Sequence, residues 1–335
     1  MKVLIAFDFP IPPPEDENFS RHISADDWRP TRNVIEALQK LGHEVVPCAI
    51  YNDTISFIMK IKNEKPDIIF NLLESFRMDR HFESHLVSIF ELLRIPYTGN
   101  SPTAITLCKN KFYTKRILTP HHIKHPRSIV VPRGRKKPGI KKLRFPLMVK
   151  PLTEESSDGI VQRSFVESEE ACIERVKMIH GHLKGDAIVE EYIEGREIYA
   201  GVIGTGRLTV LPLREMIFKN FPEGKPRFAT FKAKWDTEFR KKWGITNTFA
   251  RSLDPAIEKN IARIAKTAFR ALGLSGYARL DLRLTENNDV YLIEANPNPN
   301  LSNDDDFAYA AQRIGIEYTQ LIEKIVNWGI REERC

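Results

Sequence analysis

The chain has 335 residues, of which 42% are hydrophobic and 28% charged, so its composition is that of a globular protein of two or three domains. Four scattered cysteines without a C-x-x-C pair exclude a zinc knuckle and a disulfide framework, and they favour a cytoplasmic location. No run of eighteen apolar residues predicts a membrane span, and the N-terminal apolar stretch is too short for a signal peptide. A net charge of +7 could indicate a nucleic acid, an acidic partner or a nucleotide, but so modest an excess is more often that of a solvated surface.

The first hundred residues alternate between strand and helix patterns. We expect strands at 2–7, 44–50, 67–73 and 95–98 and helices at 30–41, 54–62 and 82–93. Such an alternation predicts a parallel sheet with helices on both faces. This first unit ends near residue 101.

The remaining residues predict a mixed α+β organisation with closely spaced strands. We expect helices at 102–118, 169–179, 255–272, 307–314 and 318–328, and strands at 147–150, 160–164, 187–192, 197–203, 208–215, 276–284 and 289–294. Residues 219–250 are polar, basic and rich in turn residues, so we expect a loop there.

The strongest chemical signal lies on the last two predicted strands. Arg279 and Asp281 are two residues apart, as are Glu294 and Asn296, so each pair shares one face of its strand. Carboxylate and amide oxygens suit Mg²⁺, and a neighbouring guanidinium can hold a phosphoryl group. A solvated strand face with ion pairs is the alternative, but the apolar residues between these polar ones indicate that the opposite face is buried.

Two weaker signals precede it. Lys150 ends an apolar strand, where a buried cation needs an anionic partner such as a phosphate. Ser156, Ser157 and a glycine follow in a turn whose backbone N–H groups could cradle phosphates, although an ordinary hairpin is the alternative. Residues 188–197 form an apolar strand that enters an acidic turn, which could border an adenine or be a surface hairpin.

Taken in order, these segments resemble the ATP-grasp fold, and more narrowly D-alanine–D-alanine ligase and its carboxylate–amine ligase relatives. The resemblance runs from about residue 65 to the C-terminus and rests on FNLLE (70–74), ELLRIPYTG (91–99), KNKFYTK (109–115), VKP (149–151), ESSDGI (155–160), VEEYIEGRE (189–197), ARLDLRL (278–284), IEANPNPNLS (293–302) and AQRIGIEYTQLI (311–322). It implies an N-terminal parallel α/β domain at 1–101, followed by two α+β subdomains, at 102–187 and 188–335, that clamp ATP.

The resemblance also implies a reaction. A substrate carboxylate would attack the γ-phosphate of ATP to form an acyl phosphate, and an amine would then displace phosphate to give an amide and release ADP. The substrates would be a small carboxylate and an amine, such as amino acids or a peptide. The cofactors would be ATP and two Mg²⁺ ions, with Mn²⁺ as a substitute. The family's tendency to dimerise predicts a homodimer.

The roles of individual residues follow from the same resemblance. Contacts with the nucleotide would come from Lys111, Lys150, Ser156, Glu190, Glu191, Ile193, Glu197 and Lys234. The metal ions would be bound by Asp281, Glu294 and Asn296. The catalytic set would be Arg279, Lys234, Ser157 and the backbone N–H near Gly276.

Three departures from the family pattern concern the substrates. The N-terminal glycine-rich turn with its glutamate is absent, and FDFPIPPPED stands there instead. Asn300 replaces a glycine of the oxyanion hole, and an acidic run, Asp304 to Asp306, falls where the family has a serine that binds a carboxylate. We therefore expect an intact ATP site and a substrate other than D-alanine.

Three other functions compete with this interpretation. The first is a ligase that modifies the end of a peptide or protein, for which the basic stretch 133–144 could dock an acidic chain. The second is an ATP-binding regulatory protein that has lost catalysis, which the complete Asp281, Glu294, Asn296 and Arg279 set disfavours. The third is nucleic-acid binding. The sequence does not support it, because it contains no zinc motif and no basic strand interleaved with aromatic residues.

Overall fold

The computed structural model describes residues 1–14, 19–135, 138–154 and 157–332. Its strands are β1 (Lys2–Asp8), β2 (Glu44–Ile50), β3 (Ile68–Leu72), β4 (Ser128–Val131), β5 (Leu147–Pro151), β6 (Phe165–Val166), β7 (Ala187–Glu191), β8 (Arg196–Gly204), β9 (Thr209–Val210), β10 (Arg214–Phe218), β11 (Ile245–Phe249), β12 (Gly276–Leu284) and β13 (Val290–Asn296). Its α-helices are α1 (Ser20–Ile23), α2 (Arg29–Lys40), α3 (Thr54–Glu64), α4 (Glu83–Leu92), α5 (Pro102–Lys109), α6 (Lys111–Leu118), α7 (Glu169–Met178), α8 (Phe231–Trp235), α9 (Thr237–Trp243), α10 (Pro255–Ala271), α11 (Asp306–Gln312) and α12 (Tyr318–Arg331).

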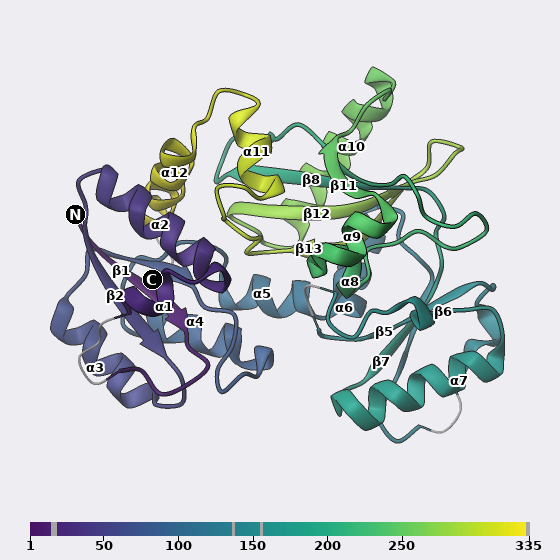
Figure 1. Cartoon of the computed structure of the whole chain (residues 1–335), viewed down its shortest axis with the longest axis horizontal. Coiled ribbons are helices and arrows are strands. Elements are labelled where there is room, and N and C mark those ends of the chain that lie inside the picture. The colour runs from purple at the N-terminus through teal and green to yellow at the C-terminus, as the bar shows by residue number, and fades with distance from the viewer. Residues whose placement is uncertain (15–18, 136–137, 155–156, 333–335) are drawn as a thin grey trace.

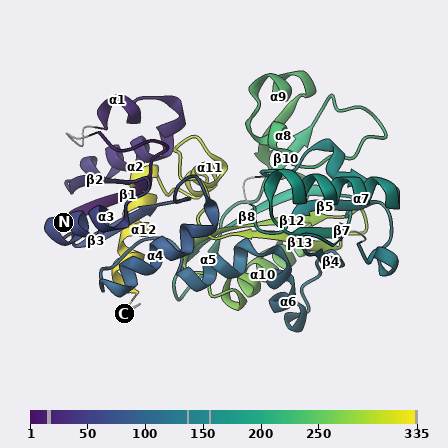
Figure 2. The same ribbon diagram turned by 90° about the horizontal axis from the view of Figure 1, so that it is seen from below.

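The N-terminal sheet is parallel, with the strand order β2-β1-β3. Alternate residues of β1 are buried against different helices. Val3 and Ile5 pack with α2 and the C-terminal helix α12, whereas Leu4 and Ala6 pack with α3 and α4. The chain thus returns at its end to cover the sheet with which it began, as Figures 1 and 2 show.

A second sheet has the order β4-β7-β5-β6 and is covered by α7 on one face. It stands apart from the N-terminal sheet, at the other end of the molecule (Figure 1). Its strands β5 and β7 are antiparallel neighbours, with Met148 opposite Glu190 and Lys150 opposite Ile188. This register brings Lys150 and Glu190 to the same face of the sheet.

The third sheet has the order β11-β10-β8-β12-β13, with β9 paired to β8. Its two faces differ in chemistry. Leu280, Leu282 and Leu284 of β12 pack in a core with α10. Arg279 and Asp281 alternate with these leucines along the strand and line the cavities. The period-two pattern of the sequence therefore produces one apolar and one charged face.

Several predicted elements differ from the observed ones. No strand covers 160–164, where residues 162–164 form a short 3₁₀ turn before β6. The predicted helix 102–118 is two helices, because Asn110 ends α5 and caps α6 with its side chain. Predicted strand 95–98 is reduced to a single bridge between Ile69 and Tyr97.

The predicted loop 219–250 contains α8, α9 and β11. The caps explain why a polar, basic stretch folds here: Thr230 and Asp236 accept hydrogen bonds from the first turns of α8 and α9. Strand β11 then joins β10 at the edge of the third sheet. The strand expected at 208–215 is divided into β9 and β10.

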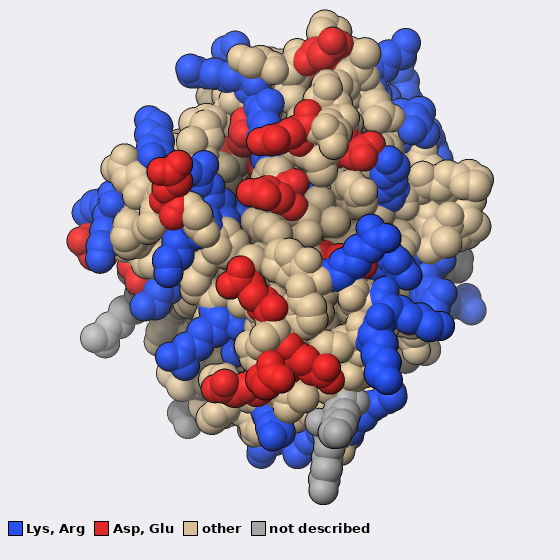
Figure 3. All heavy atoms as spheres, turned by 90° about the vertical axis from the view of Figure 1, so that its right-hand side faces the viewer, with Lys and Arg blue, Asp and Glu red and all other residues tan. Residues whose placement is uncertain are grey.

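The division of the chain at residues 101 and 187 stays a proposal. Because β7 (Ala187–Glu191) pairs with β4 and β5, we propose that the second boundary lies just after Glu191. No helix in the described part of the chain is long and apolar enough to cross a membrane. On the face seen in Figure 3, acidic side chains lie in the middle and basic ones around them, so the positive charge forms no continuous surface there.

Candidate active site

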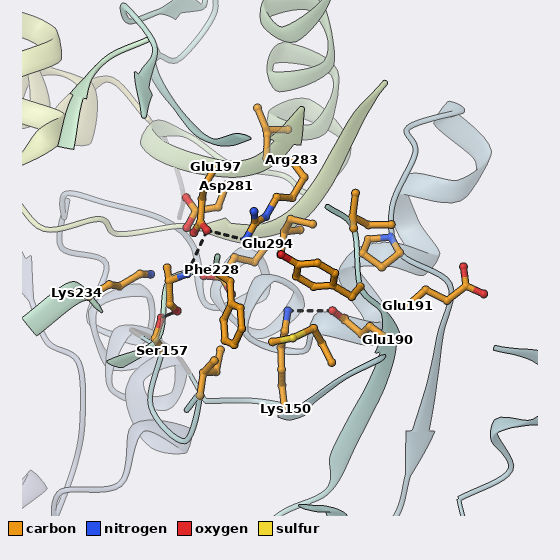
Figure 4. A pocket seen from close by; sticks show the side chains of 18 residues that line it. Lys150, Ser157, Glu190, Glu191, Glu197, Phe228, Lys234, Asp281, Arg283 and Glu294 are labelled. Atoms are coloured by element: carbon orange, nitrogen blue, oxygen red, sulfur yellow. Dashed lines mark hydrogen bonds and ion pairs between the residues drawn. The ribbon is translucent and has the colours of Figure 1, made fainter. Parts of the chain in front are cut away.

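A cavity of about 600 Å³, counted to its opening into solvent, lies between the second and third sheets. Strands β5 and β7 form one wall and β8, β12 and β13 the other. Its charged lining side chains are Lys150, Glu190, Glu191, Glu197, Lys234, Asp281, Arg283 and Glu294. Its apolar end is formed by Met148, Ile160 and Phe228, which pack together. We call this the first cavity; Figure 4 shows it from close by.

Two lysines hold Glu190 in the wall of the first cavity. The Lys115 Nζ lies 2.6 Å from Glu190 Oε1, and the Lys150 Nζ lies 3.0 Å from Glu190 Oε2. Although burial opposes it, this pair of cations lowers the pKa of Glu190 to about 2. Burial lowers the pKa of Lys115 even though Glu190 acts against this. Glu190 is thus an ionised, fixed anion between two cations.

Asp281 and Glu294 face each other across β12 and β13, as do Arg279 and Asn296. The Arg279 guanidinium binds the Asp281 carboxylate in bidentate fashion, at 2.7 Å and 3.0 Å. Burial raises the pKa of Asp281, although Arg279 opposes the shift. Burial also opposes ionisation of Glu294, but Lys234, followed by Lys111, lowers the pKa of Glu294 to about 2.

The segment 226–230 leads into α8, and its residues Phe228 and Ala229 line the first cavity. The Ala229 carbonyl accepts a hydrogen bond from the Ser157 hydroxyl (2.9 Å), and its N–H donates to Glu197 Oε2 (3.1 Å). These two bonds join the second sheet's side of the cavity to the third sheet. Lys234 follows on α8 and points into the cavity from the left in Figure 4, whereas Lys150 points into it from below.

A second cavity, of about 1300 Å³ including its opening, lies between the N-terminal unit and the third sheet. Its lining residues with charged or amide side chains are Glu74, Arg80, Glu83, Asp158, Lys234, Arg240, Asn247, Arg279, Asn296, Asn298, Asn300, Asp305 and Asp306. Lys234 lines both cavities, and the Arg279–Asp281 pair has one member in each. The two cavities therefore meet at these three side chains.

Most of the predicted site residues lie in the first cavity: Lys150, Ser157, Glu190, Glu191, Ile193, Glu197, Lys234, Asp281 and Glu294. Arg279 and Asn296 line the second cavity. The Glu191 carboxylate points away from Glu190 and accepts a hydrogen bond from the Arg144 N–H (3.0 Å), so it reaches the cavity only at its edge (Figure 4).

Two of the predicted residues that the structure describes line neither cavity. Gly276 begins β12 opposite Gly204, and five residues of extended strand, roughly 16 Å, separate it from Asp281. Lys111 begins α6, and its ammonium donates to the Glu154 carbonyl, beside the loop that precedes Ser157. Ser156 lies outside the described residues.

Sequence reasoning missed several residues that line the first cavity. Phe228 and Ala229 belong to the segment interpreted as a loop, and no local pattern pointed them inward. Tyr192 and Arg283 were within quoted motifs but had no assigned role. Arg283 could have been found, because it continues the Arg279, Asp281 alternation along β12.

The comparison with protein families bears on the same strands. The sequence model described as "D-ala D-ala ligase C-terminus" matches residues 131–327, more than half of the chain. The chain belongs to the D-alanine–D-alanine ligase family. The matched range contains all five strands that line the first cavity, β5, β7, β8, β12 and β13.

Curated relatives and solved structures of this family match over most of the chain. A D-alanine–D-alanine ligase from Bordetella petrii is 30% identical over 72% of this chain and 70% of its own length. One from Pseudothermotoga lettingae is 27% identical over 89% and 93%. The ATP complex of the Bacillus anthracis ligase superposes with a TM-score of 0.77 at 20% identity, over 100% of this chain and 98% of that one. The VanG D-Ala:D-Ser ligase from Enterococcus faecalis has a TM-score of 0.72 at 20% identity, over 98% of this chain and 100% of that one. The fold is thus the ATP-grasp α/β fold that the sequence predicted.

Proposed function

We propose that this chain is an ATP-dependent carboxylate–amine ligase that forms an amide through an acyl phosphate and releases ADP and phosphate. Family membership supports the general reaction class. The observation that carries the proposal is the meeting of two cavities at Lys234, Arg279 and Asp281. A nucleotide in the first cavity would point its phosphates at substrates in the second.

The first cavity suits ATP from end to end. Met148, Ile160 and Phe228 offer an apolar surface for an adenine ring, and Glu197 lies where a ribose hydroxyl could donate to it. Lys150 and Lys234 lie towards the charged end and would bind phosphates, with Lys111 behind the adjoining loop. The turn at Ser157, which lines the cavity, would offer backbone donors to the same phosphates.

The carboxylate pair of β12 and β13 fits a divalent cation. Asp281 and Glu294 present hard oxygen ligands from adjacent strands, and Asn296 could add an amide oxygen. None of the described residues forms a hydrogen bond or an ion pair with the Glu294 carboxylate, and its lowered pKa keeps it ionised and able to bind a cation. We propose that these residues hold Mg²⁺, or Mn²⁺ in its place, and the metal would neutralise phosphate charge.

The reaction would proceed in two displacements. A carboxylate oxygen in the second cavity attacks the γ-phosphorus, and the bond from that phosphorus to the ADP oxygen breaks. An amine nitrogen then attacks the acyl carbon, the acyl–phosphate bond breaks, and the amine loses a proton. Arg279 and Lys234 lie beside this centre and would stabilise the charge that develops on phosphoryl and carbonyl oxygens.

The acceptor end of the second cavity differs from one that would bind a free carboxylate. Asp305 lines it, and burial together with Asp306 raises the pKa of Asp305 to about 6. A carboxylate here repels another. We therefore propose that the acceptor amine is not D-alanine. One structural neighbour is named for D-serine, so the fold accommodates more than one acceptor.

The test is ADP release from ATP and Mg²⁺, screened against pools of carboxylates and amines. The proposal predicts release that requires one member of each class, and product amide in equal amount. Release that needs neither pool, or only one without an amide product, would contradict a ligase.

A further inference from the structure

Arg283 is a buried cation in the first cavity to which the proposed reaction gives no role. It lies on β12 directly opposite Glu197 of β8, and only 6% of it is exposed. An arginine removed from water to this extent needs partners for its donors. Its guanidinium makes three hydrogen bonds, to three different parts of the cavity wall.

Those three acceptors are the key to its role. Arg283 donates to the Gly195 carbonyl (2.7 Å), to Glu197 Oε2 (2.8 Å) and to the Arg227 carbonyl (2.9 Å). The first is in the turn between β7 and β8, the second is the candidate ribose ligand, and the third is in the segment 226–230, whose residues Phe228 and Ala229 line the cavity. Figure 4 shows Arg283 and Glu197 beside one another on the wall of the third sheet.

The remaining contacts of Glu197 show what this arrangement leaves open. Oε2 also accepts the Ala229 N–H (3.1 Å), so both of its donors are protein groups. Oε1 accepts the Tyr199 hydroxyl (3.1 Å), which leaves one further acceptor direction on that oxygen. Arg283 therefore fixes which oxygen of Glu197 is available to a ligand.

We infer that Arg283 is a positioning residue that orients Glu197 for the nucleotide ribose and holds segment 226–230 over the bound nucleotide. The inference rests on the proposed binding of ATP. Arg283 touches neither reacting atom: it acts through Glu197 and through the Arg227 carbonyl. A lysine at position 283 could reach Glu197, but it lacks the planar guanidinium whose N–H groups bond all three acceptors.

The test compares nucleotides that differ by one ribose hydroxyl. Calorimetry with Mg²⁺ measures Kd for ATP, 2′-deoxy-ATP and 3′-deoxy-ATP in the wild type, R283M, R283K and E197Q. The wild type should bind one deoxy analogue about tenfold more weakly, the value of one hydrogen bond to a charged group. In R283M the ratio of the Kd for that deoxy analogue to the Kd for ATP should fall towards one, because the affinity for ATP itself drops. The same ratio should also fall towards one in E197Q.

Arg196 supplies the matched control. It lies next to Glu197 on the same strand and pairs with Glu215 (2.7 Å), outside the proposed machinery. R196M should keep the wild-type ratio, and R283K, which retains a cation beside Glu197, should keep part of it. If R283M does not fold, R283K against E197Q provides the same comparison.

The outcomes distinguish a failure of the proposed function from a failure of this inference. A wild type that binds no ATP overturns the proposed function and this inference with it. A wild type that binds ATP but does not distinguish the deoxy analogues, or an R283M protein that keeps the wild-type ratio, overturns the inference alone.

Trypsin tests the second half of the inference. The bond after Lys225 precedes Pro226 and resists cleavage, whereas trypsin can cleave after Arg227, which lies in the segment that Arg283 holds. With ATP at saturating concentration, R283M should be cut there about tenfold faster than the wild type or R196M. Equal cleavage rates would show that Arg283 does not hold the segment.

Discussion

At the scale of single residues, the site depends on charges that are buried together. Asp281, Glu294 and Glu190 would each be costly to bury alone, and each lies beside lysine or arginine. The cations keep Glu294 and Glu190 ionised. The same groups therefore determine both what the cavity binds and how the fold responds to pH.

Glu294→Gln removes one proposed cation ligand at almost unchanged volume. We expect ligase turnover to fall at least about a hundredfold and to respond little to added Mg²⁺, because the remaining oxygens bind the cation weakly. Turnover is measured as ADP release, with circular dichroism to verify folding. Glu258→Gln, on the exposed side of α10, is the control and should behave as wild type. Normal turnover in Glu294→Gln would contradict the metal assignment.

Glu190 should make stability depend on pH at low pH. Its folded pKa of about 2 lies below the ordinary glutamate value of 4.5, so its contribution is complete above pH 4.5. As the pH falls from 4.5 towards 2, up to about 3 kcal/mol of the unfolding free energy is lost. Urea unfolding across this range should show a steeper loss in the wild type than in Glu190→Gln. Parallel curves for the two proteins would show that Glu190 is not the group responsible.

At the scale of elements, the turn between β7 and β8 holds the wall of the first cavity. Gly195 has φ +151°, and a Cβ there would lie 2.3 Å from the Leu284 carbonyl oxygen. The backbone of β12 cannot move away without breaking its pairing with β8. The glycine is therefore required by a close approach of two strands.

Gly195→Ala should destabilise the fold by about 2–3 kcal/mol. The measurement is the urea midpoint, with Gly206→Ala as the control, because a Cβ at Gly206 meets nothing within 4 Å. Equal midpoints for the two variants would argue against the close approach.

Elements with strong local signals could be predicted from the sequence, and those fixed by long-range contacts could not. The alternation on β12 and β13 was sufficient to predict that Asp281 and Glu294 lie together. The segment from 219 to 250 has few apolar residues at regular spacing, and its helices depend on caps and on packing against the third sheet. Phe228 is held in the cavity by long-range contacts: it packs with Met148 and Ile160, and Ser157 and Glu197 bond the adjacent Ala229.

At the scale of the whole molecule, the two cavities form where the N-terminal unit, the second sheet and the third sheet meet. The N-terminal unit supplies Glu74, Arg80 and Glu83 to the second cavity. Arg80 pairs there with Asp158 (3.4 Å), which lines the same cavity. Helix α12, from the end of the chain, in turn packs against the N-terminal sheet and completes its core. Predicting residues 1–101 as a separate unit left out this final helix, because its partners are more than two hundred residues away.

Ile325→Ala should test this return of the chain. Ile325 is fully buried in the core shared by α12 and β1, so we expect a loss of about 2–5 kcal/mol in the unfolding free energy. Urea unfolding measures it, with the exposed Lys324→Ala as the control. A loss no larger than that of the control would mean that α12 does not complete the N-terminal core.

The central claim is that the protein activates a carboxylate as an acyl phosphate. Hydroxylamine tests it without knowledge of the natural acceptor, because it converts acyl phosphates to hydroxamates that are detected with ferric iron. With ATP, Mg²⁺ and pools of carboxylates, the account predicts hydroxamate in amounts equal to the ADP released, and none from Glu294→Gln. ATP turnover on these pools without hydroxamate, or hydroxamate formation that does not require ATP, would contradict it.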